Sequence, residues 1–171
     1  IEALAAKELA LDVATQVPHG PLRAYVMGER GEKHEEATSE DLAAMAKIVE
    51  DGIRAGALGF STSRTFIHKA NSGESVPGTF AAEDALPALT EAMKLGGGGV
   101  LQMTSNHIDM AKELEWMVRV SKKTGQTVSF NMLQTDEDPE LWRRCLEIAD
   151  AAHAEGADVF PQIAGRPQGV L

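Results

Sequence analysis

The sequence predicts an α/β fold, in which about five parallel strands alternate with helices as in a partial (β/α)8 TIM-type barrel. Two observations support this prediction. Four segments have the apolar periodicity of helices, and short runs rich in Val, Phe and Leu lie between them. Because these runs are mostly entered through glycine and are apolar on both faces, they are typical of buried parallel strands.

The helical periodicity covers 38–56, 81–96, 109–125 and 138–156. The first of these segments opens on Thr38, a residue type that caps helix starts, and closes on Gly56. The third ends on basic residues followed by Gly125, as the negative end of the helix dipole favours. Both segments therefore have a defined start or stop.

The other two helical segments contain proline. Pro87 lies inside the second segment, so we expect a kink or a late start there. In the fourth segment Asp138 is the expected cap, Pro139 the first helical residue and Gly156 the stop.

The apolar runs predict strands at 11–17, 57–61, 99–103, 127–131 and 157–162. The run 22–28 is either a sixth strand or the loop after the first strand, and we favour a loop or a short extension. A closed barrel needs eight strand–helix units and about 250 residues. Residues 1–171 are therefore interpreted as a single segment of a barrel domain.

A doubly wound sheet is the competing architecture. It would show a glycine-rich phosphate turn directly after its first strand. The glycine cluster at 96–99 instead precedes a strand, on the side of a sheet where ligands are not bound. We interpret this cluster as a plain connector.

Charge and cysteine content exclude several classes of function. The formal net charge is -10, from 16 basic and 26 acidic residues. This balance argues against binding to nucleic acid or to an anionic membrane surface. No stretch approaches about 18 apolar residues, the N-terminus lacks the plan of a signal peptide, and Cys145 is the single cysteine. We therefore expect a cytoplasmic protein.

Polar residues follow the expected carboxyl ends of all the strands, whereas the opposite ends carry mostly Ala and Gly. In parallel α/β folds these ends form the functional site. The pattern predicts an enzyme or a ligand-binding barrel with a small-molecule substrate. The candidate substrate-binding residues are His19, Ser61, Arg64, His68, Gln102, Asn131, Gln134 and Arg166.

Several of these candidates have a simpler interpretation. Arg64 could hold a substrate carboxylate through two hydrogen bonds or could pair with a structural acid. His19 could bind a loop backbone instead of a ligand. Loop residues such as His68, Asn106 and His107 more often form solvated surface. The residues alone leave these alternatives open.

Metal chemistry is not indicated by the motifs. The chain has no His-x-His, no His-Glu-x-x-His and no paired cysteines, and only His19 and His107 lie near strand ends. Two imidazoles do not complete a zinc site, so we expect no complete metal site in this stretch. A Schiff-base lyase is disfavoured because no lysine sits at a strand end.

Four strings stand out along the chain: "DVATQVPHGPLRAYVMGERG", "IVEDGIRAGALGFSTSRT", "VPGTFA" and "PQIAGRPQG". They resemble segments of the N-acyl-D-amino-acid deacylase (D-aminoacylase) family of the amidohydrolase superfamily, and the similarity runs from about residue 10 to the C-terminus. The resemblance implies a metal-dependent barrel, with zinc as the expected metal of the full-length protein. It also implies hydrolysis of an amide by a metal-activated water, giving a carboxylate and a D-amino acid.

The resemblance further implies that the chain is a middle section of the barrel, inactive alone and prone to self-association through open sheet edges. It places Thr104 and Met132 where typical members carry histidine, and neither is a ligand that zinc prefers. A catalytically silent barrel that binds a small ligand is therefore the alternative. The resemblance also suggests that the loop 61–79 crosses the barrel mouth, with Arg64 facing a substrate carboxylate.

Overall fold

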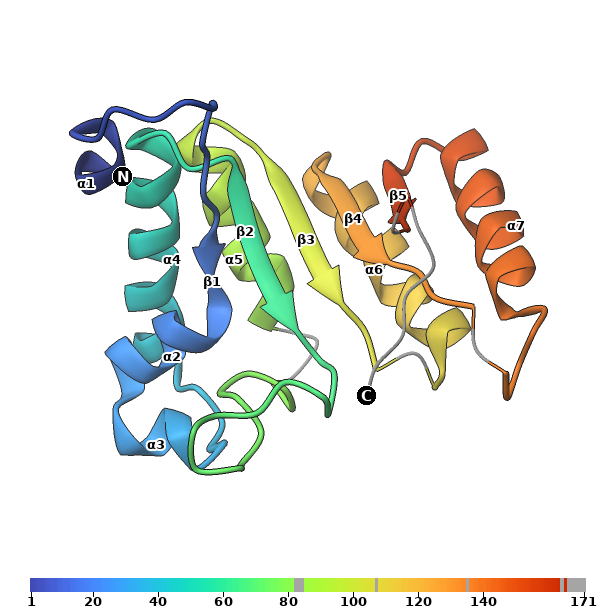
Figure 1. Cartoon of the computed structure of the whole chain (residues 1–171), viewed down its shortest axis with the longest axis horizontal. Helices are drawn as coiled ribbons and strands as arrows, with labels where there is room; N and C mark the ends of the chain where they lie inside the picture. Colours follow the sequence, from blue (N-terminus) through green and yellow to red (C-terminus); the bar gives the residue numbers. More distant parts are fainter. Residues whose placement is uncertain (82–84, 107, 135, 164, 166–171) are drawn as a thin grey trace.

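A parallel sheet of five strands forms the centre of the computed structural model (Figure 1). The structure describes residues 1–81, 85–106, 108–134, 136–163 and 165. The strands are β1 (Val17–Pro18), β2 (Gly59–Ser63), β3 (Val100–Thr104), β4 (Thr127–Asn131) and β5 (Val159–Gln162). They lie side by side in the order of the chain. This order, with a helix between successive strands from β2 to β5, confirms the predicted partial barrel.

Four helices cover one face of the sheet: α4 (Ser39–Arg54), α5 (Ala85–Gly96), α6 (Met110–Thr124) and α7 (Leu141–Ala154). Pro87 lies in the first turn of α5, where its missing N–H is not needed. Gly125 ends α6 in the left-handed conformation, with φ of 68°, as predicted. The short helices α1 (Glu2–Ala5), α2 (His19–Met27) and α3 (Glu29–Glu32) belong to the N-terminal part of the chain.

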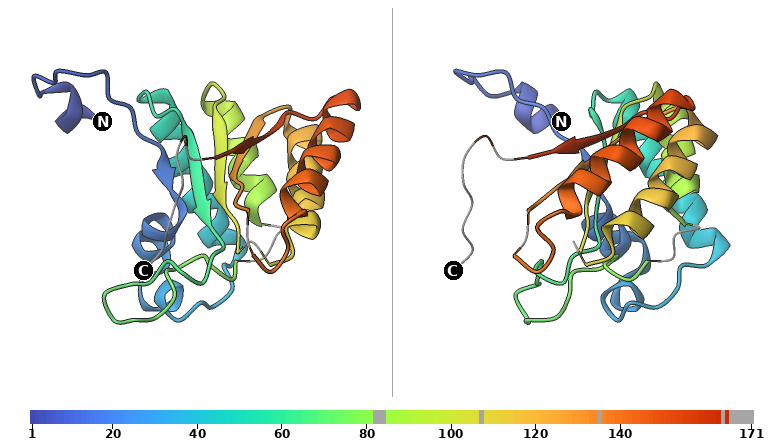
Figure 2. Two further views of the ribbon diagram at one scale, coloured as in Figure 1. Left: turned by 45° about the vertical axis from the view of Figure 1, so that its right-hand side comes forward. Right: turned by 90° about the vertical axis from the view of Figure 1, so that its right-hand side faces the viewer.

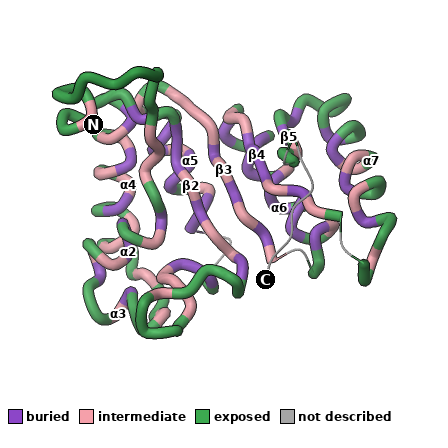
Figure 3. Tube along the Cα trace, viewed as in Figure 1, coloured by how far each residue is buried: buried purple, intermediate pink, exposed green. Residues whose placement is uncertain are grey.

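The two faces of the sheet differ in polarity because side chains alternate along each strand. In one register row, Phe60, Leu101 and Val128 are paired neighbours and all are fully buried. In the next row, Ser61 pairs with Gln102, which pairs with Ser129. Figure 3 shows the buried positions on the strands and on the helices that pack behind them. The apolar row faces the helices, which leaves the polar row on the opposite face.

The first strand is much shorter than predicted. Only Val17 and Pro18 pair with β2, whereas 11–16 lie outside any described strand. Leu11 and Val13 are 80% and 53% exposed, and the run reaches the sheet only near its end, where the Thr15 carbonyl accepts from Leu58 N at 2.9 Å among the described residues. Figure 2 shows this segment, with α1, extending away from the sheet. The prediction of a strand over 11–17 was therefore wrong for most of its length.

Residues 22–28 form most of helix α2 rather than a loop or strand, which corrects the prediction for this run. Pro18 is extended before the helix, and Pro21 lies in its first turn, where proline is tolerated. Leu22 and Met27 are buried, so the helix presents one apolar side to the core. Gly28, with φ of 58°, ends it.

Helix α7 begins at Leu141, two residues after Pro139, the first helical residue that the sequence predicted. Asp138 was expected to cap the helix, but the residue at the cap position is Glu140, and the Asp138 carboxylate binds the guanidinium of Arg144. That bond lowers the pKa of Asp138. The backbone makes a turn in which Leu141 N donates to Asp138 O at 3.1 Å, and the helix starts at Leu141.

The start of α4 provides a simple test of local stability. Thr38 and Asp41 form a reciprocal capping box, with Asp41 N donating to Thr38 Oγ1 at 3.1 Å and Thr38 N donating to Asp41 Oδ2 at 2.9 Å. We expect Thr38→Ala to lower the free energy of unfolding by about 1 kcal/mol. Urea denaturation at neutral pH measures this change. Thr38→Ser keeps the hydroxyl and should restore most of it, and equal losses in both variants would contradict the capping role.

Candidate functional site

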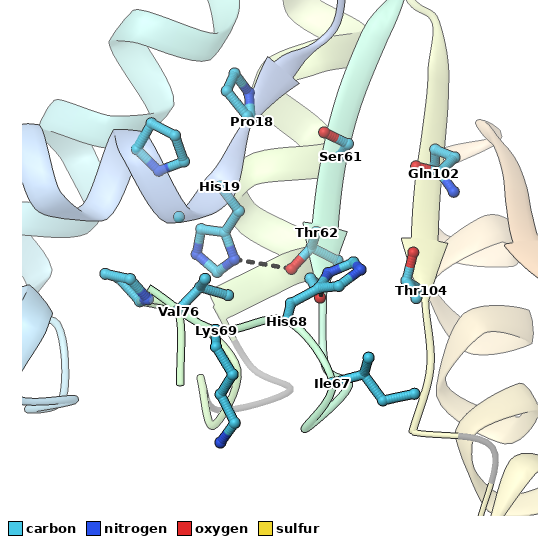
Figure 4. A pocket seen from close by; sticks show the side chains of 14 residues that line it. Pro18, His19, Ser61, Thr62, Ile67, His68, Lys69, Val76, Gln102 and Thr104 are labelled. Atoms are coloured by element: carbon cyan, nitrogen blue, oxygen red, sulfur yellow. Dashed lines mark hydrogen bonds between the residues drawn. The ribbon is translucent and has the colours of Figure 1, made fainter. Parts of the chain in front are cut away.

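A cavity of about 540 Å³ lies at the carboxyl ends of β1, β2 and β3. The first turn of α2, the ends of β2 and β3, and the loop after β2 all contribute to it (Figure 4). Its lining residues are Pro18, His19, Gly20, Pro21, Ser61, Thr62, Ser63, Ile67, His68, Lys69, Val76, Pro77, Gln102 and Thr104. No Asp or Glu is among them, although the chain as a whole is acidic.

Half of the eight predicted substrate-binding residues meet in this cavity, namely His19, Ser61, His68 and Gln102. Asn131 is not part of the lining, but its Oδ1 accepts a hydrogen bond from Gln102 Nε2 at 2.8 Å. It therefore holds the Gln102 amide in place across neighbouring strands.

The remaining candidates differ in where they lie. Gln134 is exposed and does not line the cavity. Arg166 and His107 lie outside the described residues. Thr104, at the end of β3, lines the cavity, whereas Met132 is 8% exposed and belongs to the hydrophobic core.

His19 is a buried and neutral histidine. Its side chain is 1% exposed, and its Nδ1 lies 2.9 Å from Thr62 Oγ1. Burial, followed by the nearby charges of Arg23 and Arg64, lowers the pKa of His19 from 6.5 to about 3. Its Nε2 is buried and has no hydrogen-bond partner among the residues that the structure describes. The imidazole is therefore uncharged at neutral pH, and Thr62, which sequence reasoning did not select, sets its orientation.

His68 has the opposite environment. It is exposed, and Figure 4 shows its ring between the ends of β2 and β3. Its Nδ1 lies 2.7 Å from Ser63 Oγ. Sequence reasoning missed Ser63, although the alternation of buried and less buried residues in β2 puts it on the same face as Ser61.

Arg64 pairs with an acid of the protein, which is the structural alternative that the sequence left open. Its Nε donates to Glu113 Oε2 at 3.0 Å, and its Nη1 donates to the Ala81 carbonyl at 2.8 Å. Trp116 Nε1 donates to the same Glu113 oxygen at 3.2 Å, and the guanidinium lies 5.9 Å from the Trp116 ring centroid. Arg64 thereby ties the loop after β2 to helix α6. A role for Arg64 in binding a substrate carboxylate stays a prediction.

The donor set of the cavity does not fit a metal centre. In the part of the chain that the structure describes, no three or more His, Cys, Asp or Glu residues are grouped so that they could hold a metal ion. The cavity offers two imidazoles, those of His19 and His68, and Thr62 already engages Nδ1 of His19.

Across the same described ranges, no helix combines the length and the apolar character needed to cross a membrane.

Comparison with known proteins agrees with the fold. The profile of a family described as "Amidohydrolase family" matches residues 3–168. A D-aminoacylase from Alcaligenes xylosoxydans xylosoxydans is 25% identical over 170 residues, which are 96% of this chain and 33% of that protein. The chain thus spans about a third of the length of this curated relative.

Solved structures of D-aminoacylase have the same architecture. A mutant in complex with copper chloride and a structure described for its binuclear metal centre both have a TM-score of 0.80 and 24% identity. Each comparison covers 96% of this chain and 33% of the other chain. Because the family profile matches nearly the whole sequence, the chain belongs to the amidohydrolase family.

Proposed function

We propose that the chain contributes the substrate cavity of an enzyme that hydrolyses the amide bond of an N-acyl-D-amino acid or a related amide. The observation that carries the proposal is the cavity at the carboxyl ends of β1, β2 and β3, where barrel enzymes bind their substrates. Membership in the amidohydrolase family and similarity to a D-aminoacylase support this substrate class.

The chemistry of the lining suits an acylated amino acid. Ile67 and Val76 give the cavity an apolar part that can contact an acyl chain. Gln102 and Ser61, on the polar face of the sheet, can hydrogen-bond to the amide group. Since Asn131 already orients the Gln102 side chain, little conformational freedom is lost when a ligand binds there.

For the full-length enzyme we propose a metal ion, with zinc as the expected identity. D-aminoacylase is described with a binuclear metal centre. The donors in the described part of this chain fall short of such a centre, so most ligands would come from residues outside the described ranges. The described residues that line the cavity would bind and orient the ligand and exchange protons with it.

A silent barrel that binds a small ligand is the second candidate function. It is favoured by Thr104 and Met132, which occupy positions where the family resemblance predicts histidine. Met132 packs in the core, and Thr104 offers one hydroxyl to the cavity. In this second function the cavity binds the acylated amino acid but releases no product.

The experiment is an assay of N-acetyl-D-methionine hydrolysis by the purified full-length enzyme that contains this chain, with N-acetyl-L-methionine for comparison. We expect release of the D-amino acid, and we expect Gln102→Leu to lower kcat/KM about tenfold, which is the effect of one lost hydrogen bond. Asn71→Leu is the matched control, because Asn71 is an exposed amide of the loop that does not line the cavity. Binding without product release would favour the silent barrel, and equal losses in both variants would place the site elsewhere.

A further inference from the structure

The cavity carries positive charge although the chain as a whole is acidic. The formal net charge is -10, yet no Asp or Glu is among the residues that line the cavity. The ionisable side chains of the lining are those of His19, His68 and Lys69. A lysine side chain is an ammonium ion at neutral pH. The described lining therefore contains a cation and no anion.

A short hairpin holds Lys69 at the mouth of the cavity. Residues 68–76, called here the rim hairpin, are closed by an antiparallel bridge between Lys69 and Ser75. Next to this bridge, Ala70 N donates to the Glu74 carbonyl at 2.8 Å. Figure 4 shows the lysine chain directed outward from the other lining side chains. The bonded backbone of the rim hairpin thus places a positive charge where a ligand enters.

The charge of Lys69 is not cancelled by an ion pair with any residue that the structure describes. Its Nζ donates to Ser75 Oγ, a neutral acceptor, at 3.3 Å. Arg64, in the same loop, is instead paired with Glu113, with 3.0 Å between Arg64 Nε and Glu113 Oε2. Since a hydroxyl does not neutralise an ammonium ion, the charge of Lys69 stays available to a ligand.

A buried cation adds to the positive field behind the cavity wall. Arg23 is 3% exposed, and its Nη2 donates to the neutral carbonyl of Glu35 at 2.7 Å. Its charge acts on the lining: burial is the main cause of the low pKa of His19, and the charges of Arg23 and Arg64 lower that pKa further. A field that disfavours a second cation at His19 favours an anion in the cavity.

We propose that Lys69 selects ligands by charge, because it attracts the carboxylate of an acylated amino acid to the mouth of the cavity and gives this anion an advantage over a neutral analogue. The inference rests on the proposed function and adds a criterion to it, the negative charge of the ligand. An exposed charge at a rim acts mainly on the rate of association, and salt weakens it. The advantage is therefore largest at low ionic strength.

The test uses the purified full-length enzyme that contains this chain and compares N-acetyl-D-methionine with N-acetyl-D-methioninamide, in which a neutral amide replaces the carboxylate. In about 20 mM NaCl, we expect Lys69→Met to lower kcat/KM for the carboxylate about fivefold and to leave kcat/KM for the amide unchanged. In about 500 mM NaCl most of this difference should disappear. Lys69→Arg keeps the charge and should behave like the wild type. Equal losses for both ligands, or no loss, would overturn the proposal.

Two further variants show whether the effect is electrostatic. Glu74→Gln removes an exposed negative charge from the rim hairpin, so it should raise kcat/KM for the carboxylate, opposite in sign to Lys69→Met. Lys123→Met changes an exposed lysine in the last turn of α6 that does not line the cavity, and it should leave both ligands unaffected. If Glu74→Gln lowers kcat/KM as much as Lys69→Met does, the fold of the hairpin rather than its charge is responsible, and the proposal fails.

Calorimetric titration distinguishes a failure of this inference from a failure of the proposed function. If the wild-type enzyme hydrolyses neither ligand, the proposed function fails, and the Kd values of the two ligands then test Lys69. Lys69→Met should raise the Kd of the carboxylate and leave the Kd of the amide unchanged. Equal changes in both Kd values, or a wild-type enzyme that binds neither ligand, would overturn charge selection by Lys69.

Discussion

Acidification below pH 6.5 should destabilise the protein through His19. The folded-state pKa of His19 is lowered to about 3, whereas an unfolded chain has the ordinary value of 6.5. Between these two values the unfolded chain binds a proton at this site and the folded protein does not. The stabilising contribution of His19 is therefore fully present above pH 6.5. It is lost progressively as pH falls toward 3, at a slope of about 1.4 kcal/mol per pH unit.

The geometry explains why the charged form is so unfavourable. A protonated ring would carry an N–H at Nε2, which is buried without a partner. The ring also lies close to the loop: a Cβ at Gly78 would come within 3.0 Å of Nδ1, and Gly78 has a φ of +92°. A charged imidazole would need a hydrogen-bond acceptor at Nε2, and burial of this atom without one makes the charged form unfavourable.

The variant His19→Asn isolates this effect, because its amide can occupy the place of Nδ1 beside Thr62 and does not titrate. Urea denaturation from pH 7.5 to pH 4 should show that wild-type stability falls faster than that of the variant. His153→Asn, an exposed control, should follow the wild-type curve. Carboxylates that titrate in this range are present in both proteins, so they lower the stability of both equally. Parallel curves for wild type and His19→Asn would therefore show that His19 does not cause the extra loss of stability in acid.

Local signals in the sequence predicted most of the fold. The strand 127–131 is observed with the predicted bounds, and Thr38 and Gly125 mark helix ends as expected. These features depend on a few neighbouring residues, so a short window contains the necessary information. Helix α2 was missed because Pro21 hides a buried periodicity that spans only two turns. The run 11–16 was overestimated because an apolar pattern does not show whether a partner surface exists.

The site depends on contacts that no short window contains. Ser63 and His68 are five residues apart, but their bond depends on the path of an irregular loop. Arg64 and Glu113 are 49 residues apart, and α6 brings them together. Position at a strand end could select His68 and Arg64 as candidates. It could not show that one faces the cavity while the other is paired with an acid.

The pair of Arg64 with Glu113 leads to the second prediction of large effect. Glu113 is 8% exposed and accepts hydrogen bonds from both Arg64 and Trp116. We expect Glu113→Ala to lower the free energy of unfolding by about 3 kcal/mol, because it leaves a mostly buried guanidinium without its anion. Glu115→Ala, an exposed change on the same helix, should cost little. Urea denaturation of both variants measures the difference, and equal losses would contradict the role of the pair.

The double variant Arg64→Leu/Glu113→Leu identifies the origin of the loss. With both charges removed, no unpaired charge stays buried, and the Trp116 N–H loses its acceptor in both variants, so the double variant should be more stable than Glu113→Ala. A double variant at least as unstable as the single one would show that the effect arises from packing against Trp116 rather than from the uncompensated charge.

The single variant Glu113→Ala also decides between the two roles that the sequence left open for Arg64. If Arg64 anchors the loop, its release in Glu113→Ala lets the segment that carries His68 move, and the Kd for N-acetyl-D-methionine should rise. If Arg64 instead binds the substrate carboxylate, removal of its competitor Glu113 should make the Kd fall. The bonds to Glu113 and to the Ala81 carbonyl favour the first result. Because the two roles predict opposite signs, calorimetric titration of this variant distinguishes them even where the change in affinity is small.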